Sequence, residues 1–133
     1  MMASKLRSLG IASLFVALLG SVLPVQASPV GKWEIEFGDS RYDVTLCGDG
    51  TQLCAELIWL GNGADNAQNM PYLNTLLIDR ATPTQPGEWK GNLHLFGQTA
   101  DGTITQVGAD QITLRGCVAV VLCRSYQLYR MSE

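Results

Sequence analysis

Four cysteines are the residues of this 133-residue chain whose spacing is most suggestive of chemistry. They form two close pairs, Cys47 with Cys54 and Cys117 with Cys123, separated by six and five residues. Thiolates can hold zinc, but structural zinc sites usually space them about two to four residues apart. We therefore favour two disulfides over a four-thiolate metal site and predict no metal ligands.

Other catalytic constellations are absent from the sequence. His94 is the only histidine, and the alternation around it places it on an outer face, with no nucleophile paired to it in sequence. There is no nucleophile elbow, phosphate-binding loop or dinucleotide fingerprint. Turn chemistry and a solvated face account for the acidic residues near one hairpin, which are Asp39, Asp43, Asp49 and Glu56. We predict no catalytic residue and no cofactor, and favour a protein that is not an enzyme.

The first cysteine pair must be positioned by residues 41–60, which alternate on both sides of a polar, Gly-rich centre. We predict a β-hairpin with Cys47 opposite Cys54. This register puts only apolar pairs on the core face, and a one-residue slip would destroy that sorting. The pairs are Leu46 with Ala55, Val44 with Leu57, and Tyr42 with Trp59.

The second pair predicts a similar hairpin with Cys117 opposite Cys123. Apolar pairs again share one face and polar pairs the other, and each bridge contributes roughly 2–3 kcal/mol by restricting the unfolded chain. The apolar pairs are Leu114 with Tyr126 and Ile112 with Leu128, and the polar pairs are Arg115 with Ser125 and Thr113 with Gln127.

Residues 1–27 have the features of an export signal rather than of the fold. Lys5 and Arg7 precede an apolar run over 9–23, and Val25 and Ala27 form a small-x-small cleavage site. The run is short for a transmembrane helix, which needs about 20 apolar residues, so an uncleaved anchor is the weaker alternative. We expect an exported protein, periplasmic or extracellular, in a compartment where disulfides persist and with no membrane span after cleavage.

The processed chain, 28–133, has the length of a single domain. Without Lys5 and Arg7, seven basic residues remain against twelve acidic ones, a net charge of −5. The basic residues are scattered, whereas binding to nucleic acid needs clustered Lys and Arg to neutralise phosphates. Nucleic acid is therefore not an expected partner.

Short alternating segments with turn signals between them predict about eight strands and no helix of clear period. In 31–37 we expect Trp33, Ile35 and Phe37 to face inward, and in 89–96 we expect the same of Trp89, Leu93 and Leu95. Residues 73–79 fit a strand or a helical turn, and the prolines in 81–88 argue against an interior strand. Asp101-Gly102 predicts a hairpin turn. The remaining strands are expected over 103–107, 111–116 and 124–131.

These strands predict an all-β fold, a small eight-stranded antiparallel barrel with two hairpin disulfides. Such a barrel has just enough interior for packed side chains or one small ligand. Alternation along the predicted strands gives six large side chains an inward-facing position, which we call inward parity. Such side chains either pack in the core or line a ligand cavity, and core packing is the favoured interpretation. They are Trp33, Tyr42, Trp59, Trp89, Tyr126 and Arg130.

One loop of the second hairpin is unusual because five successive residues are apolar. The loop could plug one end of the barrel, or it could contact a partner or gate a ligand. The short disulfide loop favours a lip that rests half covered on the barrel mouth. Its residues are Val118, Ala119, Val120, Val121 and Leu122.

Several short motifs resemble a family of exported bacterial proteins known as domain-of-unknown-function family 2147. They are Gly31-Lys32-Trp33, Leu53-Cys54 with Leu57-Ile58-Trp59-Leu60, Trp89-Lys90-Gly91, Gly116-Cys117-Val118 and Leu122-Cys123-Arg124-Ser125. The resemblance runs from about Val30 to Met131 and implies a lipocalin-like fold without an assigned activity. The chain departs from the family pattern at Ala55, in 95–105 and in 65–80.

A second resemblance points to the same fold. Gly31-x-Trp33 is similar to the motif that opens the first strand of lipocalins, in which an arginine late in the last strand covers the tryptophan. Inward parity offers Arg130 for this role, through a cation–π contact of about 1 kcal/mol.

Two functions remain open at this point. The first is non-catalytic binding of a small apolar or amphipathic ligand in the barrel. The second is an envelope interaction protein with a filled core and no ligand, which contacts a protein partner through Val118–Leu122 or through the polar loop Gly61–Tyr72. The sequence does not identify the ligand or the partner.

The export signal makes a direct prediction about the mature protein. We expect signal peptidase to cut after Ala27 because small residues occupy the two recognition positions. N-terminal sequencing of protein recovered from its own host should begin at Ser28. A chain that keeps residues 1–27 would favour the anchor instead.

Overall fold

A computed structural model describes residues 27–95 and 97–132 of the chain. They form eight strands and one short 3₁₀ helix, η1. Within these ranges no helix is long and apolar enough to cross a bilayer. The elements are β1 Gly31–Ile35, β2 Ser40–Cys47, β3 Gln52–Leu60, η1 Met70–Tyr72, β4 Leu76–Gln85, β5 Glu88–Leu95, β6 Gln98–Gly108, β7 Gln111–Ala119 and β8 Leu122–Arg130.

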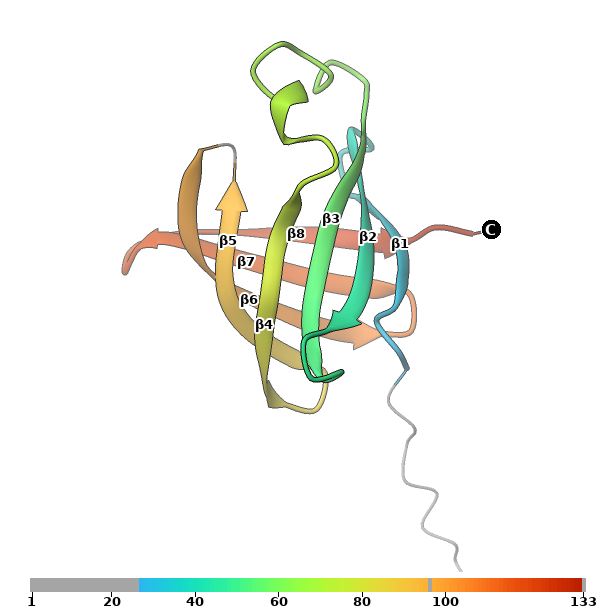
Figure 1. The fold of residues 1–133 in the computed structure, drawn as a ribbon, viewed down its shortest axis with the longest axis vertical. Coiled ribbons are helices and arrows are strands. Elements are labelled where there is room, and N and C mark those ends of the chain that lie inside the picture. Colours follow the sequence, from blue (N-terminus) through green and yellow to red (C-terminus); the bar gives the residue numbers. More distant parts are fainter. Residues whose placement is uncertain (1–26, 96, 133) are drawn as a thin grey trace, which may run out of the picture.

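The strands make a closed antiparallel barrel in simple sequence order, which confirms the predicted fold. Figure 1 shows β1 to β5 at the front, with β7 and β8 crossing behind them and the connection between β3 and β4 above one end. The barrel closes where β1 pairs with β8, with Trp33 opposite Arg130 and Ile35 opposite Leu128. Closure leaves no free sheet edge along the barrel wall.

Side chains from every strand fill the interior with one apolar cluster. Trp33, Leu53, Leu93 and Ile104 are its most deeply buried large members. Inward positions alternate with outward ones along each strand, because successive side chains of a strand point to opposite faces. The predicted inward positions of Trp33, Trp89 and Leu93 are confirmed.

The second hairpin has the predicted register. Cys117 lies opposite Cys123 and is bonded to it, and the apolar and polar pairs follow as expected. Leu114 pairs with Tyr126, and Arg115 pairs with Ser125.

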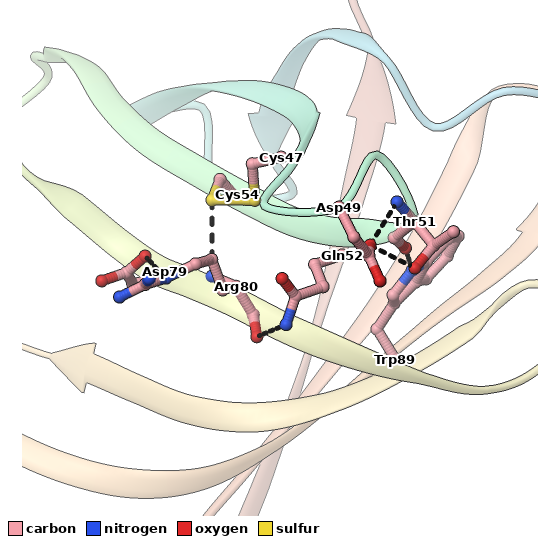
Figure 2. The surroundings of a disulfide bond; sticks show 8 residues. All are labelled: Cys47, Asp49, Thr51, Gln52, Cys54, Asp79, Arg80 and Trp89. Atoms are coloured by element: carbon pink, nitrogen blue, oxygen red, sulfur yellow. Dashed lines mark hydrogen bonds and ion pairs between the residues drawn. A yellow bond between two sulfur atoms is a disulfide. The ribbon is translucent and has the colours of Figure 1, made fainter.

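The first hairpin has its disulfide, but the predicted register is wrong by two residues. Cys54 lies opposite Thr45, and Cys47 lies opposite Gln52. The bridge therefore joins diagonal positions on one face, with Cα atoms 6.0 Å apart. A shift of two leaves every residue on the same face, so the sorting into faces did not distinguish the two registers. Figure 2 shows the bridge, with the backbone N–H of Arg80 donating to the Cys54 sulfur at 3.3 Å.

Trp59 does not face the core, contrary to the prediction. Tyr42 pairs with Leu57 but Arg41 pairs with Trp59, so Ile58 is an extra residue in β3. This β-bulge changes the parity of the strand, which brings Leu60 inside and turns Trp59 outward. The Arg41 guanidinium covers the Trp59 ring at 4.2 Å on the outer face.

Residues 81–85 continue β4, in a part of the strand that pairs on one side only, which agrees with the prediction that the prolines exclude an interior strand. Pro83 pairs with Trp89 of β5, beyond Ala81, the last β4 residue that pairs with β3. The missing N–H of Pro83 therefore costs no hydrogen bond to a neighbouring strand on that side.

Asp101-Gly102 is not a turn. Both residues lie inside β6, where Gly102 sits between Gly91 of β5 and Gly116 of β7. A Cβ on Gly102 would collide with the Leu93 side chain, so the glycine serves close packing rather than a turn.

The ends of two predicted strands also differ. Phe37 is 64% exposed because β1 ends at Ile35 and the chain then turns, so its expected inward position is wrong. The side chain of Leu95, residue 96 and positions 1–26 of the expected export signal at 1–27 lie outside the described residues.

Truncation of Trp33 tests how the barrel is held. Trp33→Ala should lower the free energy of unfolding by about 3–5 kcal/mol, because a fully buried aromatic side chain leaves a cavity. The half-exposed Trp59 is the matched control, and Trp59→Ala should cost clearly less. Urea unfolding of both variants measures this, and equal losses would contradict the assignment of the two faces.

Candidate functional site

Arg130 closes one end of the barrel, together with Trp33. Its guanidinium lies 4.4 Å from the centre of the Trp33 ring, the contact expected from the sequence. It also donates hydrogen bonds to the carbonyls of Ser28, Val30 and Ala109 at 2.7, 2.8 and 2.9 Å. These bonds tie the chain before β1 and the turn between β6 and β7 to the end of β8. We call this the closed end.

The closed end also satisfies the polar groups of its aromatic residues. The Trp33 indole N–H donates to the carbonyl of Pro29 at 2.9 Å. Trp89 is buried, and its indole N–H donates to the carbonyl of Thr51 in the turn between β2 and β3 at 2.9 Å (Figure 2). Both rings therefore have structural partners, and neither lines the cavities described next.

The barrel interior is almost completely filled. A cavity among its core side chains has a volume of about 20 Å³ and is lined by aliphatic side chains and by Tyr42. That is roughly the space of a single water molecule. The interior as it stands does not accommodate a ligand.

A larger hollow opens at the other end of the barrel, with a volume of about 430 Å³. We call it the mouth pocket. Its walls come from the ends of several strands and from the connection between β3 and β4, and they are mainly apolar. Polar groups are contributed by Asp39, Ser40, Gln68, Asn69 and Gln98.

The floor of the mouth pocket is Tyr42, with Leu77, Leu114 and Leu128. The same four residues line the small interior cavity, so they separate the two spaces. Buried Ser40 donates a hydrogen bond to the Tyr42 hydroxyl at 3.0 Å. Burial raises the pKa of Tyr42 above its usual 10.0, the bond from Ser40 opposes this, and the negative charge of Asp39 adds to it. Tyr42 is therefore neutral at pH 7.

The connection over the mouth pocket is held by its own polar side chains. The Asn62 amide donates to the Gly38 carbonyl at 2.7 Å, and the Asn69 amide donates to the Ala64 carbonyl at 3.0 Å. A Cβ on Gly97 would lie 3.0 Å from the Tyr72 hydroxyl, so η1 reaches the turn between β5 and β6. This is the polar loop singled out from the sequence, and it forms one wall of the mouth pocket.

A second hollow of about 380 Å³ lies beside the mouth pocket. We call it the side hollow. Gln98 and Tyr126 line both hollows, so the two adjoin along these side chains. Val118, Leu122 and Arg124 of the second hairpin form its outer part.

The apolar loop of that hairpin neither plugs the barrel nor rests half covered on it. Val118, Val120, Val121 and Leu122 are 59%, 97%, 85% and 64% exposed. The hairpin extends past the barrel, as the red end on the left of Figure 1 shows. The expectation of a half-covered lip is wrong because β7 and β8 continue as a two-stranded arm up to the turn.

The sequence predicted only some of the side chains that line the mouth pocket. Of the six side chains considered for ligand lining, Tyr42 and Tyr126 reach the mouth pocket. Trp33, Trp89 and Arg130 belong to the closed end, and Trp59 lies outside. Ser40 was missed, although a serine that shares the inward parity of Tyr42 and Val44 is a readable signal of a polar pocket floor.

The mouth pocket offers hydrogen-bonding groups among apolar walls. His94 is exposed on β5, away from both hollows. Across residues 27–95 and 97–132, no cluster of three or more His, Cys, Asp or Glu side chains is arranged to hold a metal ion.

The raised pKa of Tyr42 can be measured by titration at 295 nm. The chain has four tyrosines, so the difference between wild type and Tyr42→Phe isolates this one. We expect its ionisation above pH 10, because burial penalises the charged form. Since the folded pKa is raised, the stability that depends on the neutral hydroxyl is present below pH 10 and is lost as the pH rises through the folded pKa.

Tyr129 is 48% exposed and provides the control, because Tyr129→Phe should keep the late ionisation step. A Tyr42 that ionises at or below pH 10 in the folded protein would contradict its burial.

One solved structure is similar to this barrel along most of its length. It is described as "Protein HP1028 from the human pathogen Helicobacter pylori belongs to the lipocalin family". The TM-score is 0.60 at 12% identity, and the match covers 80% of this chain and 85% of that one. The likeness shows a lipocalin-like fold. No curated protein matches the sequence.

A family model described as "Uncharacterized protein conserved in bacteria (DUF2147)" matches residues 31–130. The match begins at Gly31 of β1 and ends at Arg130 of β8, so it includes the whole barrel and the residues of both disulfides. The resemblance drawn from the short motifs is confirmed, and the chain belongs to the DUF2147 family.

Proposed function

We propose that this protein binds a small amphipathic molecule in the mouth pocket, without catalysis. The lipocalin-like fold suggests small-ligand binding, and the two disulfides indicate an oxidising compartment outside the cytoplasm. Cavity volume argues against a ligand inside the barrel and allows one in the mouth pocket. About 430 Å³ lies within the usual range for ligand sites, whereas about 20 Å³ inside the barrel does not.

The observation that carries the proposal is the buried Ser40–Tyr42 pair on an otherwise apolar floor. A hydroxyl that accepts one hydrogen bond keeps its own hydrogen to donate, and Tyr42 accepts from Ser40. The ligand would place a hydrogen-bond acceptor there and lay its apolar body against Leu60 and Leu77. Ligand sites of this kind combine apolar walls with few polar groups that fix orientation.

A fluorescent probe tests the position of the site. N-phenyl-1-naphthylamine is small, mainly apolar and brightens when it leaves water, so wild type should enhance its emission saturably. Gln98→Trp places a large ring where the two hollows meet and should weaken probe binding at least fivefold. Gln85 is also exposed but does not line the mouth pocket, so Gln85→Trp should bind like wild type.

A third variant excludes binding to the exposed second hairpin. Val120→Asp should keep the probe affinity, because Val120 lines neither hollow. If Gln98→Trp kept the probe affinity and Val120→Asp lost it, the probe would bind at the hairpin, which would refute the proposed site.

The filled interior also favours a second candidate, an envelope protein that acts through its outer surface and carries no ligand. Native mass spectrometry of protein purified from its own host separates the two. A small molecule that stays bound to wild type and is lost from Gln98→Trp supports the first candidate. A bound protein, with no small molecule, supports the second.

A further inference from the structure

The second hairpin presents an unusual surface for a protein of this charge. We call Val118–Leu122 the apolar tip. It has five apolar side chains and no polar one, and Val120 is 97% exposed. The Cys117–Cys123 disulfide joins the strands directly behind it. Because the bridge already restrains the tip, little conformational freedom is lost when the tip is fixed against another surface.

Basic side chains flank the apolar tip on both faces of the hairpin. Arg115 points outward with Thr113, whereas Arg124 is on the face that lines the side hollow. Among the described residues, neither arginine takes part in an ion pair. No acidic residue occurs between 111 and 129, although the chain from Ser28 has a net charge of −5.

One carboxylate lies close to this arm on the neighbouring strand. Asp101 of β6 is exposed and pairs with Cys117, behind the apolar tip. Arg115 pairs with Thr103 of the same strand, so Asp101 lies nearer the apolar tip than Arg115 does, on the same outward face. Arg124 lies on the opposite face of the hairpin, which lines the side hollow, so the two arginines outnumber this one carboxylate. A complementary surface would be apolar where the tip is buried and anionic at the level of the arginines.

The size of the apolar tip favours a lipid surface over a protein. A standard protein interface takes about 20–30 residues from each side, whereas the tip has five. A bilayer interface accepts a narrow apolar element, with Arg side chains at the level of the headgroups. We propose that the apolar tip inserts into the interfacial region of a lipid bilayer, with Arg115 and Arg124 on lipid phosphates.

Flotation with lipid vesicles tests this directly. The chain from Ser28 is used, because the apolar run at 9–23 would itself bind lipid, and 28–132 contain all the strands of the closed barrel. At low ionic strength, the protein should bind vesicles of phosphatidylcholine with 30% phosphatidylglycerol and float with them. Val120→Asp should lower the vesicle-bound fraction at least tenfold, because the charge would have to enter the interface.

A matched control separates the apolar tip from general surface effects. Val107 is also an exposed valine, 55% exposed at the far end of β6, so Val107→Asp should bind vesicles like wild type. The double variant Arg115→Gln, Arg124→Gln should lose binding to anionic vesicles more than to pure phosphatidylcholine. Melting temperatures of all variants should match wild type, because every substituted side chain is exposed.

Three outcomes would overturn the proposal. They are absence of wild-type flotation at low ionic strength, equal flotation of Val120→Asp, and flotation that Val107→Asp reduces as strongly. A protein that crosslinks to the apolar tip while vesicles do not bind would assign the surface to a protein partner. Probe binding in the mouth pocket is measured without lipid, so either proposal can fail alone.

Discussion

The stacking of Arg130 on Trp33 joins the last strand to the first, and the barrel depends on it. One guanidinium covers a fully buried ring and donates to three carbonyls from two other segments. Arginine suits this position because its planar group can stack and donate several hydrogen bonds at once, which a lysine cannot do. With one end held in this way, the mouth pocket and the side hollow lie at the opposite end.

Because the interior is filled, a binding site is expected at the mouth of the barrel rather than in its core. Lipocalin-like barrels of eight strands have space for packed side chains or for one small ligand, and here packing takes nearly all of it. Tyr42 is then a boundary residue, with its ring against the core and its hydroxyl beside Ser40 in the mouth pocket. The same side chain stabilises the fold and supplies the polar group of the proposed site.

The sequence predicted the fold well because alternation and turn signals report directly on strands. It was right about the Cys117–Cys123 hairpin, where the cysteines are directly opposed, and wrong about the register at Cys47, where they are diagonal. Parity cannot detect a shift of two residues, nor a bulge such as the one that turns Trp59 outward. Both errors concern local pairing and leave the architecture intact.

The candidate site was less predictable for a different reason. The mouth pocket combines side chains from the first turn, the β3–β4 connection and the start of β6, which are distant in sequence. The volume of a cavity depends on how all these side chains pack, and no single segment contains that information. Among the members that were missed, Ser40 is one whose inward position could have been recognised, because it alternates with Tyr42 and Val44 along β2.

The pair formed by Gly102 and Leu93 has a consequence for how this barrel can vary. Gly102 does not have a positive φ, so its backbone would accept other residues, and the atoms nearest to an added Cβ belong to the Leu93 side chain. The two positions on adjacent strands share the volume of one large side chain. Substitution at either position alone leaves a clash or a void, whereas an exchange of sizes can conserve the packing. The two residues should therefore be coupled energetically, and in related barrels they should change together.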